Sequence, residues 1–171
     1  MTRMLSPFAL CLVLLASCQP AAEPASDGAG SLSAQDQLKR DLAMYEEVWF
    51  DFLNHGDTMA VNAEHFTEDV TIITDQGNIV GIEGVRGFYK NYLDGFSDIE
   101  FTVVDAFGQG DKIVKHWNFK GTHDGNFFGV PATGKRVDVS GVTLVKMKAG
   151  KIAAEQDFMD LLDFYTQLGL M

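Results

Sequence analysis

The hydrophobic pattern of this chain changes at Phe96. Before Phe96, apart from one short strand-like run at 70–74, the apolar side chains recur every three to four residues, as on one face of a helix. After it they alternate, as on one face of a strand. A chain with its helices first and its strands afterwards is typical of the α+β class. The sequence therefore predicts helices packed in a strongly curved antiparallel sheet.

The element boundaries follow from the same pattern and from the turn residues between its segments. Helices are expected over residues 36–54, 59–66, 82–96 and 161–168. Strands are expected over residues 70–74, 99–107, 112–122, 137–148 and 151–159. Tight hairpins between successive strands are predicted at two places. These are 108–111, which is rich in Gly and Asp, and Ala149-Gly150.

The N-terminus has the organisation of an export signal. Arg3 is followed by an apolar run at 8–16, which is too short to span a bilayer. The next residues, Leu15-Ala16-Ser17-Cys18, resemble the bacterial lipobox, in which the cysteine is acylated and becomes the mature N-terminus. We expect residues 1–17 to be a signal peptide and Cys18 to carry a lipid. Gln19 favours the outer membrane, because lipoproteins kept at the inner membrane typically have Asp there.

Composition sets the remaining limits on organisation and partners. Residues 18–34 are rich in Ala, Pro, Gly and Ser and predict a flexible tether, which leaves 35–171 as one domain. The chain has 13 basic and 24 acidic residues, a net charge of −11, which argues against nucleic acid as a partner. Its only cysteines are Cys11 and Cys18, so the domain has none for thiol catalysis or a cysteine metal site. The sequence also has no His-x-x-His or Glu-x-x-His pair and no Gly-x-Gly-x-x-Gly or P-loop motif, so we expect no metal and no cofactor.

Alternation along the strands predicts which side chains face inward. The inward set combines aromatic and polar side chains: Phe101, Asp105, Trp117, Phe119, Thr143 and Asp157. These residues fit equally well a core with satisfied polar groups and a ligand cavity. In the second case we expect a pocket of roughly a few hundred cubic ångströms. His123 would lie near its mouth, either shuttling a proton or capping the loop that follows.

The chain contains the short motifs Gly121-Thr122-His123, Gly129-Val130-Pro131 and Thr133-Gly134-Lys135, and the segment 150–169. Together these resemble the SnoaL-like polyketide cyclase (ester cyclase) family of the NTF2-like superfamily. The resemblance covers essentially the whole domain and implies a cone-shaped α+β barrel. Sheet-packed dimers are common in that superfamily, so the resemblance also implies a homodimer as one partner.

The resemblance also implies a site. In the polyketide cyclases a carboxylate on the last strand acts as general acid and base, with a histidine nearby and no metal or cofactor. The carboxylate corresponds to Asp157, whereas Thr143 stands where the family has its histidine. Gln156 replaces the family's aromatic residue before the acid. His123 matches a histidine that is common in the family.

Two functions are compatible with these residues. The first is a lipid-anchored, cofactor-free enzyme of cyclase, isomerase or hydrolase type, with Asp157 acting on a small hydrophobic carbonyl compound or ester. The second is a non-catalytic module that binds a ligand or a protein at the cell envelope. In both, Phe101, Trp117, Phe119 and Asp105 are the candidate ligand-binding residues, and the expected location is the periplasmic face of the outer membrane.

Overall fold

The computed structural model describes residues 32–171. The expected signal peptide (1–17), Cys18 and most of the expected tether lie outside the described residues. Between residues 32 and 171, no helix combines the length and the apolar character needed to cross a membrane.

The first helix, α1 (Ala34–His55), begins and ends at residues that stabilise helix termini. Ser33 is its N-cap, and its hydroxyl accepts a hydrogen bond from the Asp36 amide at 3.1 Å. Gly56 ends the helix in the left-handed conformation, with φ of 68°, which favours glycine. One face of α1 is buried, and it includes Tyr45, Trp49 and Phe52.

The later elements follow the predicted order, except that β2 was not predicted and the helix expected over 59–66 is absent. They are η1 (Thr58–Ala60), β1 (Phe66–Ile72), β2 (Ile79–Val80), α2 (Ile82–Gly95), β3 (Phe96–Gln109), β4 (Lys112–His123), β5 (Arg136–Lys148), β6 (Lys151–Met159) and α3 (Leu161–Gln167). The expected helix over 59–66 is wrong: one 3-10 turn is followed by bends and by β1. Asn62 causes the break, because its side-chain oxygen accepts from the Glu64 amide at 2.8 Å and holds a turn.

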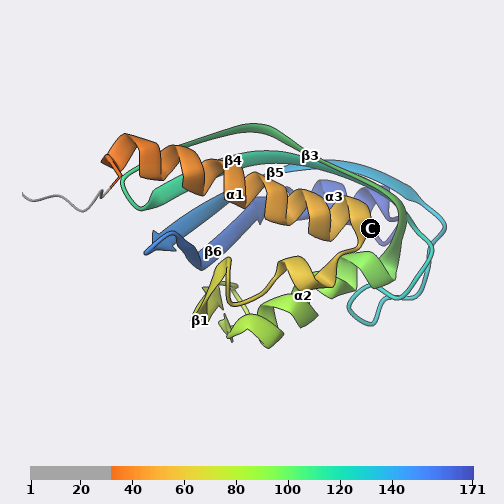
Figure 1. Ribbon diagram of the computed structural model, residues 1–171. Coiled ribbons are helices and arrows are strands. Elements are labelled where there is room, and N and C mark those ends of the chain that lie inside the picture. The colour runs from red at the N-terminus through yellow and green to blue at the C-terminus, as the bar shows by residue number, and fades with distance from the viewer. Residues whose placement is uncertain (1–31) are drawn as a thin grey trace, which may run out of the picture. The chain divides into compact units, whose positions relative to one another are not determined.

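The six strands form one sheet in the order β2-β1-β6-β5-β4-β3. The predicted α+β class and curved sheet are confirmed, but the sheet is mixed, because β1 runs parallel to β6 while the other pairs are antiparallel. Figure 1 shows α1 lying along the long curved strands and α2 lying on the side of β1. The inner face of the sheet and the two helices share one hydrophobic core.

Candidate active site

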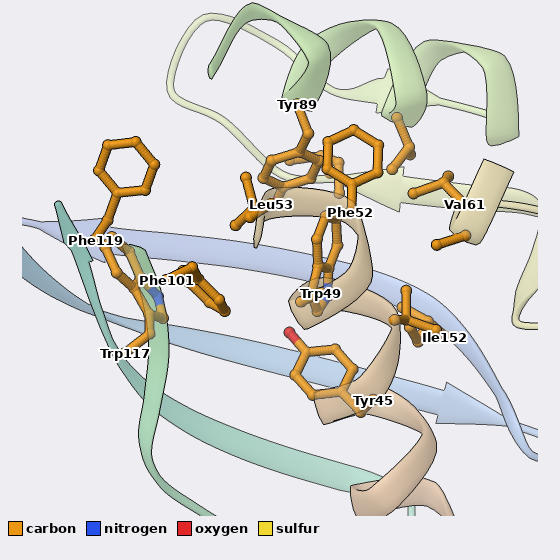
Figure 2. Close-up of a cluster of buried hydrophobic side chains, with 14 of the residues drawn as sticks. Tyr45, Trp49, Phe52, Leu53, Val61, Tyr89, Phe101, Trp117, Phe119 and Ile152 are labelled. Carbon is orange, nitrogen blue, oxygen red and sulfur yellow. The ribbon is translucent and has the colours of Figure 1, made fainter. Parts of the chain in front are cut away.

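A pocket lies between α1, α2 and the inner face of the sheet. Trp49 and Tyr89 come from the two helices, and Phe101, Trp117 and Phe119 come from the sheet (Figure 2). The apolar and aromatic lining consists of Trp49, Leu53, Tyr89, Tyr92, Phe101, Trp117, Phe119, Val139, Met159 and Phe164. The structure thus brings together the three aromatic residues expected to line a cavity, and their role in ligand binding stays a prediction.

The pocket is narrower than expected. Its open volume is about 40 Å³, which is room for water molecules but well below the ~300 Å³ at which small-molecule sites begin. The lining side chains would have to move apart to admit an organic ligand. The predicted cavity of a few hundred cubic ångströms is therefore not present in this conformation.

Asp157 is one of two charged side chains that line the pocket. It lies opposite Thr143 across the β5–β6 pair, as predicted. The Thr143 hydroxyl donates to Asp157 Oδ1 at 2.5 Å, and the Tyr89 hydroxyl donates to Oδ2 at 2.7 Å. Burial raises the pKa of Tyr89 well above its ordinary value, so the phenol keeps the proton that it donates. Both oxygens of the carboxylate are therefore held in a defined orientation.

Asp157 nevertheless remains exposed to solvent. Because it both lines the pocket and is exposed, Asp157 lies where the pocket opens to the surface. A carboxylate at this position reaches both the pocket and bulk water, with which it can exchange protons.

Thr143 connects Asp157 to the aromatic wall of the pocket. Thr143 is fully buried, and its hydroxyl accepts from Trp117 Nε1 at 3.0 Å while it donates to Asp157. A hydroxyl has one proton, and in Thr143 that proton is directed to the carboxylate. Thr143 thus orients Asp157 and Trp117, and it lacks the basic nitrogen of the histidine that the family has at this position.

Two charged residues that were not among the predicted site residues lie inside the same core. Lys115 is 4% exposed and lines the pocket, and Glu155 is 1% exposed. Glu155 Oε1 accepts from Trp49 Nε1 at 3.1 Å and from the Tyr45 hydroxyl. Glu155 Oε2 is buried and has no hydrogen-bond partner within residues 32–171.

Burial shifts the pKa of both of these groups toward the neutral form. It raises the pKa of Glu155 to about 7, an effect that the charge of Lys115 opposes. It lowers the pKa of Lys115, although Glu155 and Asp157 act in the opposite direction. Strand alternation could have identified both residues, because Lys115 shares its parity with Trp117 and Glu155 shares its parity with Asp157.

Asp105 does not face the pocket. A bulge in β3 shifts the register between Val103 and Asp105, so that Val103 lies opposite Trp117 and Asp105 lies opposite His116. An extra residue in one strand moves the side chains beyond it to the other face of the sheet. Asp105 is consequently exposed on the outer face, and its predicted inward orientation is wrong.

His123 is also outside the pocket lining. It ends β4, is fully buried, and packs against Phe96 with ring centroids 5.1 Å apart. Its Nδ1 lies 3.1 Å from Thr133 Oγ1 and accepts from the Thr133 amide at 3.3 Å. The expected place at the cavity mouth is therefore wrong, and the geometry agrees with the alternative that His123 holds the loop between β4 and β5.

No group of three or more His, Cys, Asp or Glu side chains in the described part of the chain is arranged to hold a metal ion. The chemically competent groups that the pocket brings together are the Asp157 carboxylate, the hydroxyls of Thr143 and Tyr89, and the Lys115 amine. These groups can accept a proton, donate hydrogen bonds and stabilise a negative charge.

Comparison with known proteins gives one family. The sequence model of the family described as SnoaL-like polyketide cyclase matches residues 40–168 of this chain. Two curated relatives are the aklanonic acid methyl ester cyclases DnrD of Streptomyces peucetius and DauD of Streptomyces sp. (strain C5), each 43% identical over 49 residues. The matched segment makes up 29% of this chain, 34% of DnrD and 30% of DauD. The match thus spans about a third of the length of these relatives.

Solved structures agree over a much larger part of the chain. TsrD from Streptomyces laurentii is 26% identical with a TM-score of 0.70, and the match covers 82% of this chain and 100% of TsrD. A protein from Jannaschia sp. CCS1 described as SnoaL-like is 25% identical with a TM-score of 0.68, covering 83% and 99%. These likenesses support the NTF2-like cone expected from the sequence motifs.

Proposed function

Because this chain belongs to the SnoaL-like polyketide cyclase family, we propose that it binds a small hydrophobic carbonyl compound or ester and converts it by acid–base chemistry without a cofactor. One observation carries the proposal. Asp157 lines a largely aromatic pocket with both carboxylate oxygens held by hydroxyl donors, Thr143 and Tyr89. A base that is held in place next to an apolar binding surface is what proton abstraction from carbon requires.

In the reaction that we propose, Asp157 removes a proton from the carbon next to a carbonyl group. The electron pair of that C–H bond forms a carbon–carbon double bond, and the carbonyl π pair moves to oxygen to give an enolate. In a cyclisation the enolate carbon then attacks a second carbonyl of the same molecule, and Asp157 returns its proton to the resulting alkoxide. In an isomerisation the proton returns to another carbon.

The curated relatives support the ester and carbonyl part of this proposal. Both are named as methyl ester cyclases, and their match to this chain is limited to 49 residues. We therefore extend the reaction type to this chain, and not the individual substrate.

The proposal can be tested by the exchange of α-protons. The protein is incubated in D2O with a panel of β-keto esters and 1,3-diketones, and deuterium incorporation is followed by NMR. We expect wild-type protein to accelerate exchange for at least one compound, and Asp157→Asn to lose about two to four orders of magnitude of that rate. Asp105→Asn is the matched control, because Asp105 is exposed on the outer face, and it should keep the wild-type rate.

A second candidate function is ligand binding without catalysis. It is favoured by Thr143, which stands where the family has its histidine. Thr143 cannot supply a second base, and this suits a module that binds a hydrophobic ligand without converting it. In that case the compounds would bind to wild-type protein without faster exchange, and Asp157→Asn would change their affinity modestly. This outcome would reject catalysis and keep ligand binding.

We also propose that the protein is anchored by a lipid on Cys18 at the periplasmic face of the outer membrane. The support is the Leu15-Ala16-Ser17-Cys18 motif behind an apolar run. Expressed in a Gram-negative host, the protein should fractionate with outer membranes and incorporate labelled palmitate. Cys18→Ser should remove the label. Unlabelled, soluble wild-type protein would reject the anchor.

A further inference from the structure

Lys115 is a buried cation with no anionic partner in contact. Its Nζ lies 4.7 Å from the centre of the Tyr45 ring and 5.2 Å from the centre of the Trp49 ring. The Phe101 ring is a third aromatic neighbour, also at 5.2 Å. Within residues 32–171 no hydrogen bond to Nζ is formed, and none of the ion pairs with N···O distances up to 4.0 Å includes Lys115.

An ammonium group in this position reduces the stability of the fold. Burying a charge that has no ion-pair partner and no hydrogen-bond partner destabilises a fold. The three aromatic rings offset part of this cost through cation–π attraction. A methionine would pack against the same rings without any charge to desolvate. Glu155 and Asp157 favour the charged form of Lys115, and the side chain lines the pocket, so the ammonium group is placed to meet an anion there.

The position of Lys115 relative to Asp157 indicates which kind of ligand the amine can bind. Lys115 lies opposite Thr143 on β5, and Thr143 lies opposite Asp157 on β6. Neighbouring strands are about 4.8 Å apart, so the backbones of Lys115 and Asp157 are about 10 Å apart. Both side chains line that pocket. Once the lining side chains move apart, a carbonyl compound between them can present its α-carbon to the carboxylate and its oxygen to the amine.

We propose that the Lys115 ammonium group binds the oxygen anion of an enolate in this pocket. The ligand class is a 1,3-dicarbonyl compound, whose enolate spreads its charge over two oxygens. This inference deepens the proposed function and rests on the same pocket. When Asp157 takes the α-proton, the negative charge moves from its carboxylate to the ligand oxygen. Lys115 donates hydrogen bonds to that oxygen.

Equilibrium binding tests this role without any turnover. The probe is dimedone, a cyclic 1,3-diketone that is largely an enolate anion at neutral pH, and the reference is its O-methyl enol ether, which has a similar shape and no charge. Calorimetry on the purified full chain should show that wild-type protein prefers the enolate by about tenfold or more, as expected for a hydrogen bond to a charged group. Equal affinity for the two compounds would overturn the proposal.

Variants identify the residue responsible. Lys115→Met should abolish the preference for the enolate and leave the affinity for the ether nearly unchanged. Lys112→Met is the matched control, because Lys112 is an exposed lysine on the same strand, and it should keep the preference. Near-UV circular dichroism verifies the fold of each variant. If Lys115→Met does not fold, the wild-type comparison of the two ligands still decides whether the pocket binds the anion.

Two further measurements separate this inference from its competitors. Asp157→Asn should lose α-proton exchange but keep or increase the preference for the enolate, because it removes a nearby negative charge. Failure of the exchange assay alone would therefore reject catalysis and leave the anion site intact. Borohydride treatment in the presence of a ketone, followed by mass spectrometry, would reveal a reduced Schiff base on Lys115. That adduct would overturn the ammonium role in favour of a covalent one.

Discussion

Glu155 places a carboxylic acid in the core, where only one of its oxygens has a partner among the described residues. Burial raises its pKa from an ordinary 4.5 to about 7. The folded protein therefore holds more protons than the unfolded chain between about pH 4.5 and 7. This stabilising contribution is complete below pH 4.5 and is lost as the pH rises through 7.

Glu155→Gln removes this titration while it keeps an oxygen that can accept from Tyr45 and Trp49. We expect the free energy of unfolding of the variant to rise relative to wild type by up to about 3 kcal/mol as the pH increases across that window. Urea denaturation of both proteins at a series of pH values measures the difference. If the difference in free energy of unfolding between Glu155→Gln and wild type does not change with pH, Glu155 stays ionised in the fold, stabilised by the charge of Lys115.

At the scale of the element, β5 depends on a glycine to accommodate the pocket wall. A Cβ on Gly141 would lie 2.2 Å from Cζ2 of Trp117 and 2.7 Å from the carbonyl oxygen of Phe158. Neither the buried indole of Trp117 nor the strand backbone at Phe158 can move away easily. The glycine thus lets Trp117 lie flat over β5, where its Nε1 reaches Thr143.

We expect Gly141→Ala to lower the free energy of unfolding by about 1–3 kcal/mol, the usual cost of overpacking. The tryptophan fluorescence should change as Trp117 is displaced. Gly87→Ala provides the control, because Gly87 lies in α2 with no atom within 4 Å of the added Cβ, and it should stabilise the helix by about 0.5–1 kcal/mol. Equal effects of the two substitutions would contradict this account of Gly141.

At the scale of the whole molecule, the outer face of the sheet has an exposed apolar patch. The patch consists of Val104, Phe107, Leu144 and Phe158, each between 46% and 57% exposed. They come from β3, β5 and β6, and the β3 bulge brings Phe107 to this face. Several large apolar side chains on one sheet face are characteristic of an interaction surface.

We expect two chains to pair through this patch, as the family resemblance implies. Light scattering after gel filtration should give the mass of a dimer for wild-type protein. Leu144→Glu should give a monomer, because it brings two like charges together across the interface, and Met59→Glu on η1 should remain dimeric although Met59 is 62% exposed. A monomeric wild-type protein would reject the assembly.

Much of this architecture could be read from the sequence, because its signals are local. The change of hydrophobic period near Phe96, the turn at Ala149-Gly150 and the alternation in β5 and β6 depend on neighbouring residues, and they correctly predicted the helix-then-sheet order and the pairing of Thr143 with Asp157. The family motifs added the cone and identified Asp157 as the candidate acid.

Other features depend on contacts between residues far apart in the chain, and only the tertiary structure decided them. One bulge in β3 reversed the orientation of Asp105, although the alternation of its neighbours is regular in sequence. The Tyr89 hydroxyl reaches Asp157 across 68 residues, and Lys115 becomes a buried cation only when α1 and β3 place aromatic rings around it. Strand period determines which residues can share a face; packing determines which of them lose contact with water, and that loss gives a charged side chain its chemistry.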